Sequence, residues 1–130
     1  MTSEEQTIPP LLDGAIALVP QESDELRACR EVAADSTAPL EGRLAAYDDL
    51  IAAEVGDTPL TRARNLEREN GIRQIYLKFE GANPTGTHKD RIAFAQVYDA
   101  LRRGFDTITV ATCGNFGTAL SFAASLAGLR

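Results

Sequence analysis

The sequence predicts an α/β fold. Its second half alternates strand-like and helix-like runs: a strand over Ile75 to Phe79, a helix over Asp90 to Arg103, a strand over Thr107 to Ala111 and a helix from Gly117 to Ala127. This alternation is typical of parallel strands joined through helices in a layered fold. Each strand leads into its helix through a loop that contains glycine. We therefore expect both loops to meet at one edge of a sheet.

The composition restricts the class of protein. The 130 residues suffice for one modest domain, and 44% hydrophobic with 25% charged residues is ordinary for a globular protein. A net charge of −6 argues against nucleic-acid binding through a general basic field. The chain contains no apolar run long enough to cross a bilayer and no secretory signal pattern at its start, so the sequence predicts a cytoplasmic protein. Two cysteines form neither a disulfide framework nor a zinc pattern.

The first half predicts helices. Met1 to Glu22 lacks periodicity and is interpreted as an arm that packs on something larger or is partly disordered. Ser23 is a suitable cap for a helix that runs to Ala34. Leu40 to Val55 is a second helix, with apolar residues three and four positions apart, and Gly56 fits its end.

Local signals also predict how the second helix connects to the first strand. GDTPL (56–60) is a tight connection, and Ala63 to Asn70 is a short helix that Gly71 stops. Since two strands make a poor sheet, we expect this chain to be incomplete as a fold. The division that we expect is an arm with helices over 1–56 and the start of a binding domain over 57–130.

The first loop, GANPTGTHK (81–89), ends in Lys89 at a helix start, where free N–H groups favour anions. Lys89 could bind a phosphate as a cation or serve as an amine nucleophile. A nucleotide-binding P-loop is disfavoured, since the lysine comes three positions after Gly86 and Asp90 replaces the Ser or Thr that holds Mg²⁺. An ordinary solvated lysine remains the simplest alternative.

The second loop, TCGNFG (112–117), would present N–H groups, a hydroxyl and an amide to a carboxylate. A carboxylate cradle beside a reactive lysine suits an amino-acid substrate. The alternatives are that Thr112 only caps a helix, that Asn115 is a plain turn residue, and that Cys113 is a small packing residue or a nucleophile. His88, the single histidine, suits a surface or capping role as well as a ligand contact.

Three motifs carry a resemblance to a known family. KFEGANPTGTHKDR (78–91) resembles the KxExxxPTGSxKDR signature of the fold-type II pyridoxal-phosphate enzymes, the tryptophan synthase β family. GDTPL is similar to the segment that precedes this signature, and TCGNFG is similar to the family's S-[ST]-G-N-x-G loop. The resemblance covers 57–130 and implies a three-layer parallel-sheet fold of the tryptophan synthase β type, present here only as its N-terminal βα units.

The resemblance implies a cofactor and roles for individual residues. Lys89 would form a Schiff base with pyridoxal 5'-phosphate, Asn115 would bond the phenolic oxygen of the cofactor, and His88 could lie near its phosphate. The other residues of the second loop would hold the substrate carboxylate. They are Thr112, Cys113, Gly114, Phe116 and Gly117.

PTGTHKD (84–90) most resembles threonine synthase and its relatives, which implies a lyase or synthase that works by elimination or replacement at the β or γ carbon of an amino acid. The family implies a homodimer for a complete chain. From the residues themselves we expect no metal, nucleic acid or membrane to be involved. Cys113 and His88 depart from the residues common in the family, and the family's later cofactor-binding elements are absent. The alternative is a truncated homologue, or a half-site that depends on a partner and has no activity of its own.

Overall fold

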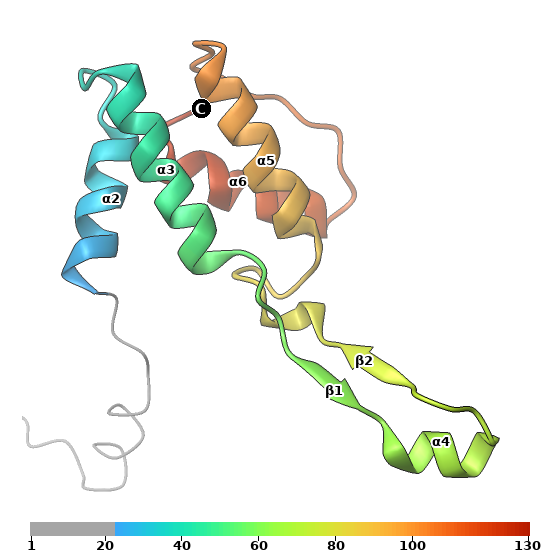
Figure 1. The fold of residues 1–130 in the computed structure, drawn as a ribbon. Helices are drawn as coiled ribbons and strands as arrows, with labels where there is room; N and C mark the ends of the chain where they lie inside the picture. The colour runs from blue at the N-terminus through green and yellow to red at the C-terminus, as the bar shows by residue number, and fades with distance from the viewer. Residues whose placement is uncertain (1–22) are drawn as a thin grey trace, which may run out of the picture.

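The computed structural model describes residues 23–130 (Figure 1). The predicted N-terminal arm, Met1 to Glu22, lies outside the described residues. In chain order the elements are the helices α2 (Asp24–Ala34) and α3 (Leu40–Glu54), strand β1 (Leu60–Arg62), helix α4 (Arg64–Asn70), strand β2 (Tyr76–Lys78), the 3₁₀ turn η1 (Glu80–Ala82), and the helices α5 (Lys89–Arg102) and α6 (Asn115–Leu126). The predicted helices are confirmed, with ends that differ by at most two residues.

Local signals account for the helix boundaries. The hydroxyl of Ser23 accepts a hydrogen bond from the Leu26 N–H at 3.2 Å and caps α2. Gly71 follows α4 in the left-handed conformation, and Gly104 has a φ of 78° after α5. Such positions favour glycine, because it has no side chain to clash with the following carbonyl.

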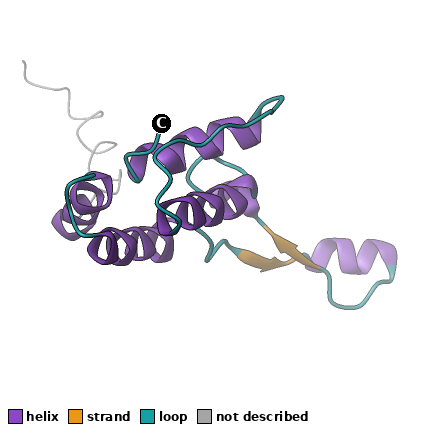
Figure 2. Cartoon of the chain, turned by 90° about the horizontal axis from the view of Figure 1, so that it is seen from above, coloured by secondary structure: helices purple, strands orange, loops and turns teal. Residues whose placement is uncertain are grey.

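The core lies between the four longer helices (Figure 2). The rings of Tyr47 on α3 and Phe94 on α5 stack with centroids 5.9 Å apart, and Phe122 on α6 lies 6.0 Å from Phe94. The buried Tyr47 hydroxyl donates a hydrogen bond to the Ala123 carbonyl at 3.1 Å. These contacts fix α5 and α6 against each other and against α3, so the starts of α5 and α6 are held on one framework.

The strand pairing differs from the expected one. The predicted strand at 75–79 exists as β2, but it pairs antiparallel with β1, with Thr61 opposite Leu77. β1 begins at Leu60, the last residue of GDTPL (56–60), which was interpreted only as a connection. A hairpin partner nearby in sequence supplies the backbone hydrogen bonds that an isolated strand lacks.

The predicted strand at 107–111 is not assigned as a strand. The Ile108 N–H donates to the Arg130 carbonyl at 2.7 Å, and the Arg130 N–H donates to the Asp106 carbonyl at 2.9 Å. Arg130 is thus bonded to Asp106 and Ile108, the residues on either side of Thr107, which is the pattern of a single bridge between parallel strands. A single bridge does not make a strand of residues 107–111. The predicted parallel pairing of strands 75–79 and 107–111 is therefore wrong for the described residues.

The β1–α4–β2 segment extends away from the helical body and is called the projecting arm, as distinct from the predicted N-terminal arm (Figures 1 and 2). Every residue of both strands is exposed. Leu60 and Phe79 expose 62% and 63% of their surface, so neither belongs to the core. Within residues 23–130, no helix is long and apolar enough to cross a membrane, and no group of three acidic, histidine or cysteine side chains could hold a metal ion.

Candidate functional site

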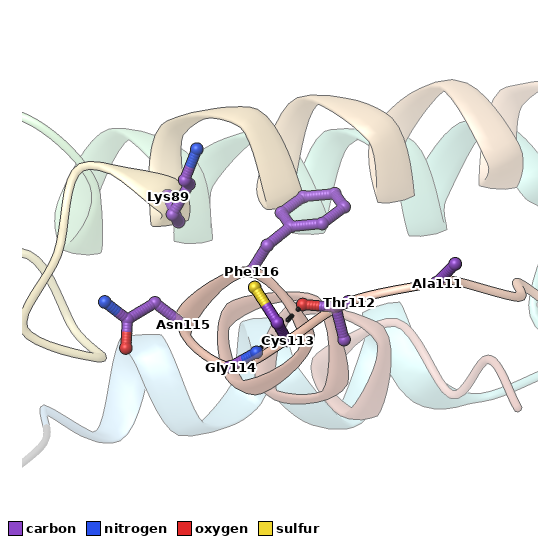
Figure 3. Close-up of a pocket in the computed structure, with 7 residues that line it drawn as sticks. All are labelled: Lys89, Ala111, Thr112, Cys113, Gly114, Asn115 and Phe116. Carbon is purple, nitrogen blue, oxygen red and sulfur yellow. Dashed lines mark hydrogen bonds between the residues drawn. The ribbon is translucent and has the colours of Figure 1, made fainter.

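The starts of α5 and α6 line one open cavity of about 610 Å³ (Figure 3). This volume is in the range of sites that hold small molecules and cofactors. α5 contributes Lys89, and the loop before α6 together with the first two residues of that helix contributes the residues 111–116. The two loops that the sequence singled out therefore meet, although no parallel sheet joins them among the described residues.

Lys89 is the first residue of α5 and is half-buried. Its backbone N–H donates to the Thr87 hydroxyl at 3.2 Å. Within residues 23–130 its amine makes no hydrogen bond or ion pair, so the amine is available to a ligand. In the view of Figure 3 the amine points away from Asn115. It would reach a ligand beside that loop by rotation of its flexible four-carbon stem.

A β-turn precedes the lysine. The Gly86 N–H donates to the Asn83 carbonyl at 2.8 Å, which places Pro84 at the second position of the turn, and Gly86 has a φ of 82°. The turn is fastened to the helix by Asp90, whose carboxylate accepts hydrogen bonds from the Thr85 N–H at 3.0 Å and from the Thr85 hydroxyl at 2.7 Å. Hydrogen bonds within the chain therefore give the lysine loop a defined shape.

A polar network joins the lysine helix to the rest of the loop. The carboxylate of Glu80 accepts hydrogen bonds from Arg91, from the Thr58 hydroxyl at 2.9 Å and from the Asn83 amide at 3.0 Å. Arg91, then Thr58 and Asn83, lower the pKa of Glu80 to about 2, because each bond favours the ionised carboxylate. The buried Asn83 also accepts the Gly56 N–H at 3.0 Å. The network connects 56–58, 80–83 and the first turn of α5.

The α6 loop is organised by Thr112. Its hydroxyl accepts hydrogen bonds from the Gly114 N–H at 3.3 Å and the Gly117 N–H at 3.1 Å. A side chain on Gly117 would place its Cβ 2.4 Å from the Thr112 methyl group, so the close approach requires glycine. Two of the N–H groups expected to face a carboxylate are therefore taken by Thr112. Those of Asn115 and Phe116 donate no hydrogen bond within residues 23–130.

The structure brings most of the predicted site residues together. The cavity is lined by Lys89, Thr112, Cys113, Gly114, Asn115 and Phe116, with Ala111 in addition. His88 is exposed and Gly117 lies behind Thr112, and neither lines the cavity. The sequence analysis named no partner for Glu80, Asp90 or Arg91, and so did not predict their direct connection to the lysine loop. The pattern that could have indicated it is the acidic residue before the turn and the Asp-Arg pair directly after the lysine.

Comparison with known families decides the relationship. A model of the family described as "Pyridoxal-phosphate dependent enzyme" matches residues 51–130. The chain belongs to this family. The matched range contains both helix starts and the whole polar network, so the resemblance drawn from the three motifs is confirmed.

Curated members of the pyridoxal-phosphate-dependent enzyme family are similar to this chain. Tryptophan synthase beta chain 2 of Thermococcus kodakarensis is 51% identical over 83 residues, which are 62% of this chain and 19% of the relative. Threonine synthase of Methanocaldococcus jannaschii is 42% identical over 75 residues, 58% of this chain and 18% of the relative. Cysteine synthase B of Escherichia coli is 40% identical over 80 residues, 58% of this chain and 26% of the relative.

The chain therefore spans between 18% and 26% of the length of these pyridoxal-phosphate-dependent relatives. No solved structure matches it. The family implies a fold-type II α/β architecture and dependence on pyridoxal phosphate, and its members here are synthases of amino acids.

Proposed function

We propose that this chain carries the lysine side of the active site of a pyridoxal-phosphate-dependent lyase or synthase that acts on an amino acid. The observation that carries the proposal is the single cavity lined by Lys89 and by the loop 111–116. It combines a primary amine without a partner in the described chain, an amide side chain and backbone N–H groups at a helix start. These groups suit an aldehyde, a phenolic oxygen and a carboxylate, respectively.

The residues present fit the cofactor on one side. The Lys89 amine would bond its aldehyde carbon, and the Asn115 amide would donate a hydrogen bond to its phenolic oxygen. His88, outside the cavity lining, enters the proposal only as a contact to the cofactor phosphate. When bound, pyridoxal phosphate supplies an electron sink for the substrate's α-carbon.

The loop at the start of α6 would hold the substrate carboxylate. The N–H groups of Asn115 and Phe116 are the available donors, and the dipole at the start of α6 favours an anion. Thr112 would act indirectly, since its hydroxyl orders the loop by accepting from Gly114 and Gly117. Cys113 would border the carboxylate. The Lys89 amine, once released from the cofactor, would accept the α-proton at Nζ.

The finer proposal is a threonine synthase-like activity, by elimination or replacement at the β or γ carbon. PTGTHKD (84–90) supports it, as does the similarity to threonine synthase. Tryptophan synthase beta chain and cysteine synthase B are comparably similar, so a replacement on a serine-derived substrate is the competing activity.

We further propose that the complete assembly is a cytoplasmic homodimer with the three-layer parallel sheet of the family, and that 57–130 begins its cofactor domain while 1–56 forms an arm with helices. The second candidate function is a half-site that depends on a partner and has no activity alone. The observation that favours it is the small share of the relatives' length that this chain spans. Activity on addition of a partner chain, and none without it, would favour this candidate.

The direct test uses the two lysines of the chain, Lys78 and Lys89. The purified chain is incubated with pyridoxal phosphate, reduced with borohydride and mapped by mass spectrometry. The label is expected on Lys89 and should disappear in Lys89→Arg. Lys78→Arg is the matched control and should leave it unchanged, since the Lys78 amine already donates to the Thr58 carbonyl at 2.6 Å. Equal label on both lysines would overturn the proposal.

A further inference from the structure

Asp90 is a fully buried carboxylate directly after the candidate lysine. Both of its oxygens are used by one residue: Oδ2 accepts from the Thr85 N–H at 3.0 Å, and Oδ1 accepts from the Thr85 hydroxyl at 2.7 Å. A buried charge is tolerated when hydrogen bonds replace its water. The two bonds to Thr85 supply this compensation and close the chain around residues 85–90.

The ring formed by this pair contains Lys89. The first residues of a helix have no intrahelical partner for their N–H groups and separate easily from the helix. Here the Lys89 N–H is held by Thr87, and the Asp90 N–H reaches the Thr87 carbonyl at 3.4 Å. The Thr85–Asp90 pair holds Thr87 in turn, because it fastens the turn before Thr87 to the helix after it.

We propose that Asp90 is a positioning residue for Lys89: with Thr85 it keeps the start of α5 closed, so that the lysine amine leaves the helix at a fixed point on the cavity wall. The inference rests on the proposed function, in which that amine bonds the cofactor. The Arg91–Glu80 pair closes a wider loop, 80–91, and fastens it to Thr58, whereas the Thr85–Asp90 pair closes only residues 85–90 immediately around the lysine.

The test compares Thr85→Val, which removes the hydroxyl hydrogen bond, with Thr85→Ser, which retains it. We expect the rate of borohydride-trapped labelling of Lys89 by pyridoxal phosphate to fall roughly tenfold in Thr85→Val, the factor that follows from losing a hydrogen bond to a charged group. Thr85→Ser should retain the wild-type rate. Amide hydrogen exchange of residues 85–91, measured without cofactor, should rise in Thr85→Val alone.

A matched control lies in the turn between α2 and α3. Asp35, an exposed carboxylate away from the cavity, accepts hydrogen bonds from the same two groups of a threonine, the Thr37 N–H at 2.8 Å and the Thr37 hydroxyl at 2.7 Å. Thr37→Val should leave the labelling rate unchanged. If Asp90 had only a structural role, the labelling rate would fall in proportion to the drop in melting temperature in both Thr85→Val and Thr37→Val.

The outcomes separate this inference from the proposed function. No label on Lys89 in the wild-type chain would overturn both. Label on Lys89 at equal rates in Thr85→Val and Thr85→Ser would overturn only the positioning role. Should Thr85→Val fail to fold, Thr85→Ala, which removes the same hydroxyl and leaves no methyl group against the carboxylate, is measured instead. A fall in labelling of roughly tenfold is expected there too, and labelling at the wild-type rate would overturn the positioning role.

Discussion

The Arg91 guanidinium donates two hydrogen bonds to the Glu80 carboxylate, at 2.7 Å from Nε and 3.1 Å from Nη2. Paired donors of this kind hold the carboxylate in one orientation as well as attracting its charge. The same carboxylate receives the Thr58 hydroxyl and the Asn83 amide. One acidic side chain therefore fastens the base of the β1–β2 arm to the helix that begins with Lys89.

The first prediction concerns acid stability. The pKa of Glu80 is lowered to about 2 from its ordinary value of 4.5, chiefly by Arg91. A lowered pKa in the folded state contributes stability that is complete above pH 4.5 and is lost as the pH falls towards 2. Glu80→Gln removes this dependence. In urea unfolding between pH 2 and pH 7, the stability difference between wild type and variant should shrink as the pH falls through that window.

The remaining carboxylates with lowered pKa serve as the internal reference for this experiment. They are Asp35, Glu67, Asp99 and Asp106, and they are common to both proteins. A stability difference that stays constant across the window would exclude Glu80 as the source.

The second prediction concerns Gly117. Gly117→Ala should destabilise the chain by about 1–3 kcal/mol, the usual cost of forcing a methyl group into a packed site, because the new Cβ meets the Thr112 methyl. Gly42→Ala on α3 is the control: nothing lies within 4 Å of its added Cβ, so it should be neutral or stabilising. Adding Thr112→Ser, which removes the methyl but keeps the hydroxyl, should restore most of the loss in thermal unfolding. A double variant no more stable than Gly117→Ala would contradict the clash.

The third prediction concerns Tyr47 in the core. Burial raises its pKa above the ordinary value of 10.0, so the folded state favours the neutral phenol. The stability that this confers is present below pH 10 and is lost as the pH rises further. Tyr47→Phe loses the bond to the Ala123 carbonyl and should destabilise by about 0.5–1.5 kcal/mol at neutral pH. Tyr98→Phe, at a half-buried position, is the comparison in denaturant unfolding, and an equal loss in both variants would argue against the bond.

The fourth prediction concerns Asn115. In the proposed site its amide contacts the phenolic oxygen of the cofactor. Asn115→Ala should therefore leave the borohydride-trapped label on Lys89 in place but shift the visible absorbance of the bound cofactor. A spectrum identical to that of the wild type would remove Asn115 from the ring contact. Thr118→Ala changes an exposed residue three positions further along α6 and tests whether any substitution at this helix start has the same effect.

The helices could be predicted because their signals are local. Ser23 caps α2 and Gly71 ends α4 through contacts within a few residues. Both loops were found for the same reason, since Gly86 and Thr112 act on their own neighbours. These signals were sufficient to locate most of the residues that line the cavity.

Strand pairing could not be predicted in the same way, because a strand is defined by its partner. Apolar residues from Thr107 to Ala111 have strand character, but within the described chain only Arg130 pairs with them. The partner of β2 proved to be β1, three residues that carry no alternation. The partners of Glu80 and Asp90, among them Thr58 and Thr85, could not be predicted because they are set by the folded turn rather than by a motif.

The projecting arm can be treated as a separable module. No core residue lies between Val55 and Ala93, and the two ends of the arm meet where the Thr58 hydroxyl donates to Glu80 at 2.9 Å. A short turn grafted between those two residues would close the chain without disturbing the helices. The shortened protein would keep Lys89 and the loop 112–117 on the same framework, and it would shed the exposed apolar side chains Leu60, Leu77 and Phe79 that favour self-association.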